Sequence, residues 1–232
     1  MQKDSHNKFK NRIEAGVLLA NKLSSYSGLP DLLVLGLPRG GVPVAYEVAK
    51  KLKAPLDVAL VRKLGVPGHK ELAMGAIASG GVKILNYDVI SSLRISQKTI
   101  DEVTSRELQE LARREKLFKG NRLGGGPIIR DRTVILIDDG IATGSTMRAA
   151  ITILNAQRPA KLILAVPVGP TSIWREFGST VDEIVCLKNP EDLYAIGLWY
   201  EDFSQTSEQE VCAILEQANA TSLGKTIDKP EG

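Results

Sequence analysis

The sequence predicts an α/β fold with an open parallel sheet that is flanked by helices. Three apolar runs support this prediction: Leu32–Leu35, Val134–Ile137 and Leu162–Val166. None of them alternates with polar residues, which is typical of strands that are covered on both faces. A helical pattern separates the last two runs, and strand, helix and strand over about thirty residues predict a right-handed crossover in a parallel sheet.

Length and composition predict a single domain. A chain of 232 residues with 43% hydrophobic content can bury one substantial core. We expect this domain to span residues 9–219, with a core at about 30–166 and a small C-terminal hood at about 167–205. The polar ends, residues 1–8 and 220–232, are expected to be disordered tails.

Composition also limits the partners. The 30 basic and 27 acidic residues leave a net charge of only +3, which gives no general field for nucleic acid. Two histidines, and two cysteines without a Cys-x-x-Cys pair, do not indicate a histidine- or cysteine-based metal site. No signal peptide or long apolar span is visible, so a cytoplasmic protein without a membrane partner is expected.

Spacing and breakers predict the other regular elements. Apolar residues recur at helical spacing over Phe9–Leu23, over most of Ile90–Lys119 and over Glu208–Ala218. Further strands are expected at Val58–Val61 and Val181–Cys186.

The turn after the first strand, Leu32–Leu35, reads Gly-Leu-Pro-Arg-Gly-Gly and precedes a helix over Val42–Leu52. Gly40 and Gly41 let the backbone approach an anion closely, and Arg39 adds a fixed positive charge. Strand, turn and helix in this order form an anion-binding unit. The competing interpretation is an ordinary glycine turn with a solvated arginine.

The stretch KLGVPGHKELAMGAIASGG, which begins at Lys63, is rich in glycine and is not expected to form a continuous helix. We expect a flexible lid loop that closes over a bound ligand with Lys63, His69 and Lys70. For His69 a bare surface loop is the competing interpretation. Residues 82–89 are expected to continue a sheet as a hairpin or edge strand.

The stretch VILIDDGIATGSTM, residues 134–147, places charge at the end of a buried strand. Asp138 and Asp139 follow the strand directly, and small residues lead into a helix that begins at Ser145. Successive backbone N–H groups, three hydroxyls and the helix N-terminus form a cradle for a phosphate dianion. The carboxylates suit a sugar diol beside that phosphate. The implied ligand is therefore a sugar phosphate with free hydroxyls.

Other motifs fit this stretch less well. Receiver domains also place two aspartates after a strand, but near the N-terminus and without a phosphate loop. The Walker loop needs a lysine where Ser145 stands, and the dinucleotide fingerprint Gly-x-Gly-x-x-Gly is absent. A purely structural turn has no need of two carboxylates at the strand end.

At these residues the chain resembles the type I phosphoribosyltransferases, whose signature is an apolar strand, two acidic residues and a Thr-Gly-x-Thr phosphate loop. The segment FKNRIEAGVLLANKL also looks like the opening helix of a bacterial branch of that superfamily. The resemblance implies transfer of the 5-phosphoribosyl group of phosphoribosyl pyrophosphate (PRPP) to a nitrogenous base or related acceptor, with release of pyrophosphate. It further implies Mg²⁺ as the cofactor and a homodimer as the assembly.

The resemblance also implies roles for individual residues. Asp138, Asp139 and Lys63 are the expected catalytic residues; the two aspartates would bind the ribose and contact Mg²⁺ only indirectly. The remaining matches are Ala142, Thr143, Gly144, Ser145 and Thr146 for the 5′-phosphate loop, and Arg39, Gly40 and Gly41 for the pyrophosphate loop.

One departure from the family narrows the acceptor. Members that act on 6-oxopurines usually carry an Asp where this chain has Ala142, so hypoxanthine and guanine are disfavoured. Aromatic faces that could stack another nucleobase, or serve in core packing or a dimer contact, gather within residues 167–203. They are Trp174, Phe177, Tyr194, Trp199, Tyr200 and Phe203.

A regulatory protein on the same fold, which binds PRPP or a nucleotide without turnover, is the second hypothesis. The acid pair, both anion loops and the basic lid favour turnover, and the sequence shows neither a helix-turn-helix nor a strongly basic face. A receiver-type phosphohydrolase would need a further aspartate and lysine at strand ends, which the pattern does not supply.

Overall fold

The computed structural model describes residues 8–119 and 127–223. Its helices are α1 (Arg12–Lys22), α2 (Gly41–Leu52), α3 (Tyr87–Ser92), α4 (Gln97–Lys119), α5 (Ser145–Ala156), α6 (Ile173–Phe177) and α7 (Glu208–Leu223). Its strands are β1 (Leu32–Gly36), β2 (Leu56–Val58), β3 (Val61–Val66), β4 (His69–Ala78), β5 (Lys83–Leu85), β6 (Thr133–Ile137), β7 (Lys161–Val168) and β8 (Glu183–Lys188). Short 3₁₀ helices are η1 (Ser24–Tyr26) and η2 (Ile196–Trp199).

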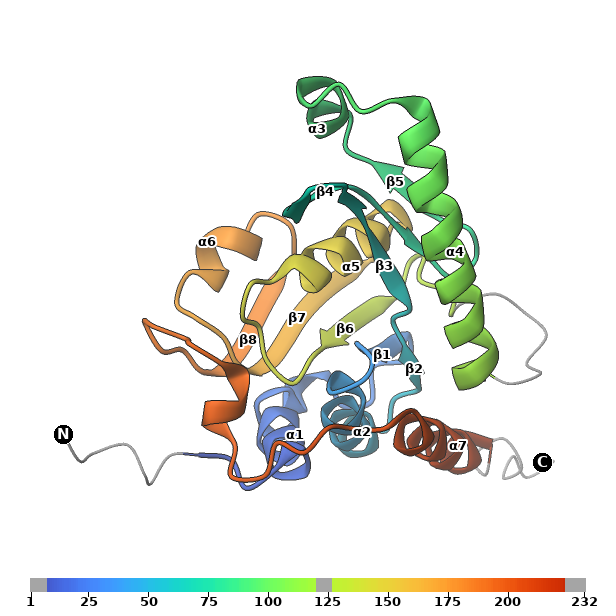
Figure 1. The fold of residues 1–232 in the computed structure, drawn as a ribbon. Helices are drawn as coiled ribbons and strands as arrows, with labels where there is room; N and C mark the ends of the chain where they lie inside the picture. Colours follow the sequence, from blue (N-terminus) through green and yellow to red (C-terminus); the bar gives the residue numbers. More distant parts are fainter. Residues whose placement is uncertain (1–7, 120–126, 224–232) are drawn as a thin grey trace.

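Five strands form the parallel sheet that the sequence predicts. Their order is β2-β1-β6-β7-β8, and every neighbouring pair is parallel. The register pairs Gly36 of β1 with Ile137 of β6, so these two strands end level with each other. The segments that follow β1 and β6 therefore leave the sheet side by side at its carboxyl edge (Figure 1).

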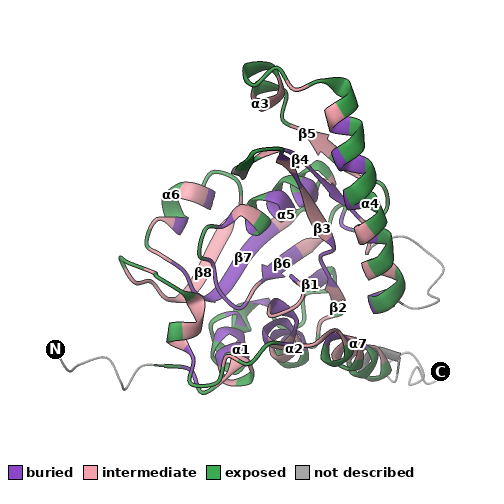
Figure 2. Cartoon of the chain, in the orientation of Figure 1, coloured by how far each residue is buried: buried purple, intermediate pink, exposed green. Residues whose placement is uncertain are grey.

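The core lies on both faces of this sheet. Alternate side chains of a strand point to opposite faces, and here they divide between two apolar clusters. Leu33 and Leu35 of β1 pack with residues of α5, whereas Leu32 and Val34 pack with residues of α1 and α2. β1 and β6 are buried almost throughout (Figure 2). This two-sided burial explains why the sequence shows unbroken apolar runs at these strands.

The glycine-rich stretch after Lys63 is a β-hairpin and not the loop that we expected. β3 and β4 pair antiparallel, and β5 adds a third strand to this second sheet, which lies over α5 (Figure 1). Gly68 has a φ of +79° in the turn between β3 and β4. A Cβ on Gly75 would overlap the carbonyl oxygen of Ile84. The glycines thus permit a tight turn and a close strand approach.

The chain passes from one sheet to the other where a single strand was expected. β2 ends at Val58 and β3 begins at Val61, so the expected strand Val58–Val61 is a junction between two strands. The backbone N–H of Ala59 still bonds to the parallel sheet, and the carbonyl of Leu60 already bonds to the hairpin side. An apolar run of this length cannot reveal such a change of sheet, because both sheets bury it.

The C-terminal part also differs from the expected boundaries. The strand expected at Val181–Cys186 is β8 (Glu183–Lys188), and it forms the edge of the parallel sheet although it lies within the range expected for the hood. α7 continues to Leu223, so residues 220–223 are helical and not part of a disordered tail. The expectations for residues 1–7 and 224–232 concern positions outside the described part of the chain.

α4 is the long helix expected within Ile90–Lys119, and it has 23 residues. Its buried face includes Ile100, Val103 and Leu111, and it contacts β3, β4 and α7. Within residues 8–119 and 127–223, no helix combines the length and apolarity needed to cross a bilayer.

Candidate functional site

The turn after β1 and the loop after β6 approach each other closely at the carboxyl edge of the parallel sheet. A Cβ on Gly41 would lie 2.7 Å from the carbonyl oxygen of Ile137 and 2.8 Å from Cα of Asp138. Both neighbours are backbone atoms of β6 and its end, which cannot move aside without disturbing the packed core. Gly41 is therefore needed to bring the two segments together.

Asp138 is the first of two carboxylates at the end of β6. Its Oδ1 accepts a hydrogen bond of 2.9 Å from the backbone N–H of Asp139. Burial raises the pKa of Asp138 well above its ordinary value, and the adjacent Asp139 carboxylate adds to this rise. A ligand that donates hydrogen bonds to this carboxylate, as a sugar diol does, would favour its charged form.

Asp139 has different surroundings, because its side chain is already paired. Its Oδ2 accepts from Nε of Arg12 at 2.8 Å, and each of these side chains is only 12% exposed. The hydroxyl of buried Tyr200 donates to the carbonyl oxygen of Asp139 at 2.6 Å. α1 and the C-terminal segment thus hold Asp139 from two sides, and the two carboxylates are not equivalent.

Arg12 is a residue of this site that sequence reasoning missed. Its Nη1 donates to the carbonyl oxygen of Ser204 at 2.7 Å, and its guanidinium lies 4.0 Å from the ring centroid of Phe203. The apolar spacing around Arg12 indicates only a packing helix, and Asp139 lies 127 positions away in the chain. No local pattern in the sequence predicts the contact between Arg12 and Asp139.

The loop after Asp139 has the form of an anion cradle. Gly144 has a φ of +68° and is the N-cap of α5, and Thr143 is exposed beside it. The first N–H groups of a helix have no partner within that helix, so they are available to a bound anion. The five residues of the predicted phosphate loop, 142–146, therefore lie together at the N-terminus of α5.

The turn after β1 touches the acid pair. A Cβ on Gly40 would overlap Oδ2 of Asp139 and lie 2.6 Å from its Cγ. The peptide bond between Pro38 and Arg39 is cis. With its amide oxygen turned toward Arg39, the side chain of Gln205 accepts a hydrogen bond from the guanidinium. The predicted Arg-Gly-Gly turn and the predicted ribose acids thus form one continuous surface.

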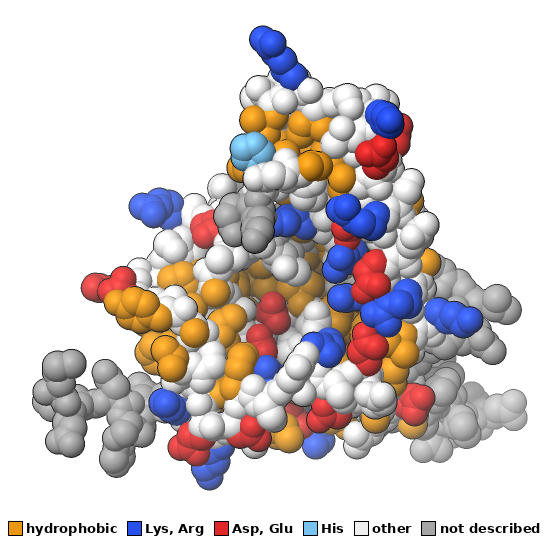
Figure 3. All heavy atoms as spheres, viewed as in Figure 1, with side chains coloured by type: hydrophobic (Ala, Val, Ile, Leu, Met, Phe, Trp, Pro, Cys, Tyr) orange, Lys and Arg blue, Asp and Glu red, His pale blue; other side chains and the backbone are white. Residues whose placement is uncertain are grey.

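Lys63 of β3 lies between the two anion loops. It lines a cavity of about 400 Å³, here called the α4 cavity, together with Pro38 of the turn and Thr146 of the phosphate loop. It also lines a larger cleft of about 820 Å³ with Thr143 and Ser145. Figure 3 shows acidic side chains inside a central hollow of this face and basic side chains along the rim formed by α4.

Of the other two expected lid residues, only His69 has a described side chain, and it is not brought to the loops. His69 is exposed at the start of β4 and lines neither of the two hollows. The side chain of Lys70 lies outside the described part of the structure. Among the expected lid residues whose side chains are described, Lys63 joins the site and His69 does not.

The aromatic residues of the expected hood divide into two groups. Tyr200 packs against Phe9 and Phe203, with ring centroids 5.3 Å and 5.0 Å away. Its hydroxyl holds the backbone of Asp139. Trp174 is 45% exposed and Tyr194 is 86% exposed. The buried group therefore has a structural role, and the exposed rings are the ones accessible to a ligand.

A metal site formed by the protein alone is not present among residues 8–119 and 127–223, where no three His, Cys, Asp or Glu side chains cluster suitably. Mg²⁺ commonly binds through one or two carboxylates together with substrate phosphates. The carboxylate of Asp138, next to the phosphate loop, fits such a shared site.

The chain is similar to a known protein family, to solved structures and to curated sequences. The family described as "Phosphoribosyl transferase domain" matches residues 7–188. The crystal structure of TT1426 from Thermus thermophilus superposes with a TM-score of 0.82 at 37% identity, covering 90% of this chain and 98% of that chain. The parallel sheet with flanking helices that the sequence predicts is thereby confirmed as the fold of this family.

Two relatives extend the comparison. "Putative phosphoribosyl transferase Rv0571c" of Mycobacterium tuberculosis (strain ATCC 25618 / H37Rv) is 46% identical over 211 residues, which are 91% of this chain and 47% of the relative. The chain thus spans about half the length of this curated relative. "Bifunctional protein PyrR" of Pediococcus pentosaceus is 29% identical over 136 residues, which are 58% of this chain and 71% of the relative. On the match over residues 7–188 and these similarities, the chain belongs to the phosphoribosyl transferase family.

Proposed function

We propose that this chain transfers the 5-phosphoribosyl group of PRPP to a nitrogenous acceptor and releases pyrophosphate, with Mg²⁺ as cofactor. The observation that supports this most strongly is the position of Asp138. Its carboxylate lies at the end of β6, between the phosphate loop at the N-terminus of α5 and the Arg-Gly-Gly turn after β1. A sugar with an anion at each end matches this order of groups.

In the proposed complex each part of the site binds one part of PRPP. Residues 142–146 hold the 5′-phosphate through backbone N–H groups and hydroxyls. Asp138 accepts hydrogen bonds from the ribose diol, and Arg39 and Lys63 face the pyrophosphate. As the acceptor nitrogen bonds to C1 and the bond to pyrophosphate breaks, positive character builds on the ribose and negative charge on the departing pyrophosphate. A bound Mg²⁺ would partly neutralise that negative charge.

The protein contributes position and electrostatics to this reaction and no nucleophile. Asp138 lies beside the carbon that becomes positive, and the cations face the group that becomes negative. Arg12 has an indirect, positioning role: it fixes Asp139, which in turn contacts Gly40 of the pyrophosphate turn. A rigid arrangement of this kind lowers the barrier mainly by orienting the reactants.

The acceptor is proposed to be a nitrogenous compound other than a 6-oxopurine. Ala142 has no carboxylate to serve the N7 of such a purine. The exposed ring of Tyr194 offers a face on which a flat acceptor can stack.

Pyrophosphate release in the presence of PRPP, Mg²⁺ and a panel of pyrimidines, purines and small amines tests this proposal. One acceptor class should raise the rate at least about tenfold above the acceptor-free rate, and removal of Mg²⁺ with EDTA should abolish the rise. The Asp138→Asn variant serves as the inactive control. Tight PRPP binding without release for any acceptor would instead support a regulatory protein that senses PRPP.

A further inference from the structure

The α4 cavity has a strongly basic lining. Among the described residues that line it, the charged side chains are Arg62, Lys63, Arg106 and Arg114, and one acid, Glu107. The cavity reaches Pro38 of the pyrophosphate turn and Thr146 of the phosphate loop. Four cations beside one acid around so small a volume favour an anionic ligand.

The single acid of the lining is already paired. Oε2 of Glu107 accepts from Nε and Nη2 of Arg62 at 2.8 Å and 2.6 Å. Oε1 of Glu107 lies 3.3 Å from Nε of Arg106. Because the Glu107 side chain is only 11% exposed, this pairing also fixes Arg62 in place on the cavity wall. Glu107 therefore holds Arg62 and Arg106 in position on the cavity wall.

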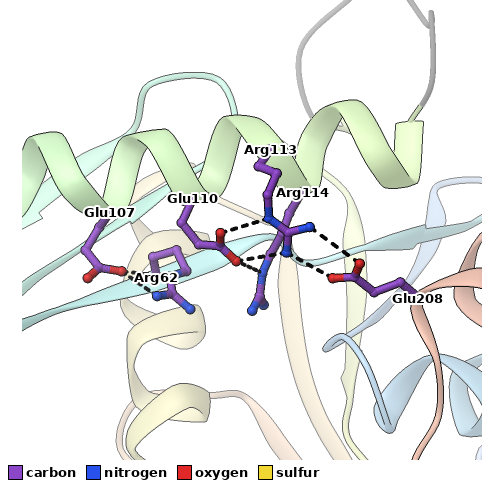
Figure 4. Close-up of polar contacts among 6 residues, drawn as sticks. All are labelled: Arg62, Glu107, Glu110, Arg113, Arg114 and Glu208. Atoms are coloured by element: carbon purple, nitrogen blue, oxygen red, sulfur yellow. Dashed lines mark hydrogen bonds and ion pairs between the residues drawn. The ribbon is translucent and has the colours of Figure 1, made fainter.

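Arg114 brings further donors to the same wall. Its Nε donates to Oε1 of Glu110 at 2.8 Å, which orients the side chain. Figure 4 shows Arg114 on the same side of α4 as Arg62. Among the described residues, its terminal Nη1 and Nη2 groups make no hydrogen bond. A guanidinium held at Nε and unpaired at its far end is suited to bind a phosphate in bidentate fashion.

Arg113 lies next in the chain but has a different role. Its Nη2 donates to Glu110 at 3.1 Å and to Glu208 of α7 at 2.9 Å, as Figure 4 shows. It does not line the α4 cavity. Glu110 is thus shared: Arg113 ties α4 to α7, and Arg114 remains beside the cavity.

We propose that Arg114 of α4, together with Arg62, binds the pyrophosphate end of the phosphoribosyl donor in the α4 cavity. The inference rests on the proposed function for the identity of the donor, and on the geometry of α4 and β3 for the residues. Residues of α4 would then help the site discriminate between a donor that carries a diphosphate and a sugar that carries only a 5′-phosphate. The backbone turn at Arg39 then supplies one side of the diphosphate site, and the two arginines supply the other.

Calorimetric titrations with pyrophosphate, ribose 5-phosphate and PRPP test the proposal in the wild type and in the Arg114→Gln variant. Loss of one charge-assisted, bidentate contact should weaken pyrophosphate and PRPP binding about tenfold or more. Ribose 5-phosphate binding should stay within about twofold, because it depends on residues 142–146. Arg114→Lys should recover only part of the loss, since an ammonium lacks the planar fork.

Arg113→Gln is the matched control, because it removes the same charge from the next position of the same helix. It should leave pyrophosphate affinity within about twofold. An equal loss in Arg113→Gln would show a general field effect and overturn the assignment to Arg114. Unchanged pyrophosphate binding in Arg114→Gln would overturn it directly.

The two proposals fail in different ways. If the wild type binds pyrophosphate through Arg114 but binds neither ribose 5-phosphate nor PRPP, the transferase proposal is wrong, and the α4 cavity is a pyrophosphate site with another use. If Arg114→Gln binds PRPP with full affinity and turns it over, the transferase proposal is supported, and the assignment of pyrophosphate to the α4 cavity is wrong.

Discussion

Replacing Arg12 with methionine is expected to lower the free energy of unfolding by about 3–5 kcal/mol, because it leaves a buried carboxylate without its partner. Asp139 is 8% exposed, and its Oδ2 is bound by Nε of Arg12 at 2.8 Å. Chemical denaturation followed by circular dichroism measures the change. PRPP affinity should fall as well, since a displaced Asp139 disturbs Gly40 in the turn beside it.

A double-mutant cycle separates the ion pair from ordinary packing. Arg12 also stacks on Phe203 and bonds to Ser204, so part of its loss has nothing to do with charge. Asp139→Asn in the Arg12→Met background should recover a measurable part of the stability, because it removes the unpaired charge. Additive effects of the two substitutions would contradict the description of Arg12 and Asp139 as a coupled buried pair.

Gly40→Ala is expected to cost about 3 kcal/mol of stability and to weaken PRPP binding at least about 100-fold. The new methyl group would overlap Oδ2 of Asp139 and lie 2.6 Å from its Cγ. Asp139 cannot yield without leaving Arg12, which binds the same oxygen. The turn after β1 must therefore shift away from the end of β6, and the two halves of the donor site separate.

Gly65→Ala provides the comparison for stability, because a Cβ at Gly65 meets nothing within 4 Å. It should change the free energy of unfolding by less than about 0.5 kcal/mol. A Gly40→Ala protein as stable as Gly65→Ala, with normal PRPP affinity, would show that the turn and the acid pair are not tightly joined.

The residues after β1 and β6 were predictable because their chemistry is local. An unbroken apolar strand, then small residues, then a helix start encodes an anion loop within about fifteen positions. Parallel strands place such loops at one edge of a sheet, so the joining of the Arg39 turn with Asp138 followed from the fold class. The acid pair itself was recognisable from its position directly after a buried strand.

The hairpin of β3 and β4 was not predictable in the same way. Glycines at positions 65, 68 and 75 look like loop residues in the sequence, but two of them serve particular backbone needs. Gly68 takes a positive φ in the turn, and Gly75 allows β5 to approach β4. Which use a glycine has depends on its neighbours in space, and a single sequence does not contain that information.

The contacts of Arg12 and Arg114 could also not be predicted from the sequence. Arg12 meets a carboxylate from β6 and a ring from the C-terminal segment, all far apart in the chain. α4 carries nearly balanced charges, a pattern that by itself indicates a solvated or subunit-facing helix. The structure shows that its acids Glu107 and Glu110 hold arginines beside a cavity. Long-range pairing of this kind is fixed by tertiary structure and leaves no periodic pattern.

Isothermal titration of PRPP with Mg²⁺ into the wild type and the Asp138→Asn variant tests whether Asp138 forms part of a PRPP site. The variant should fold with at least wild-type stability, because burial already raises the pKa of Asp138 and disfavours its charge. We expect a dissociation constant on the order of micromolar for the wild type and at least a tenfold weaker one for the variant, a difference of about 1.4 kcal/mol or more. A folded wild type that does not bind PRPP would contradict the proposed PRPP site.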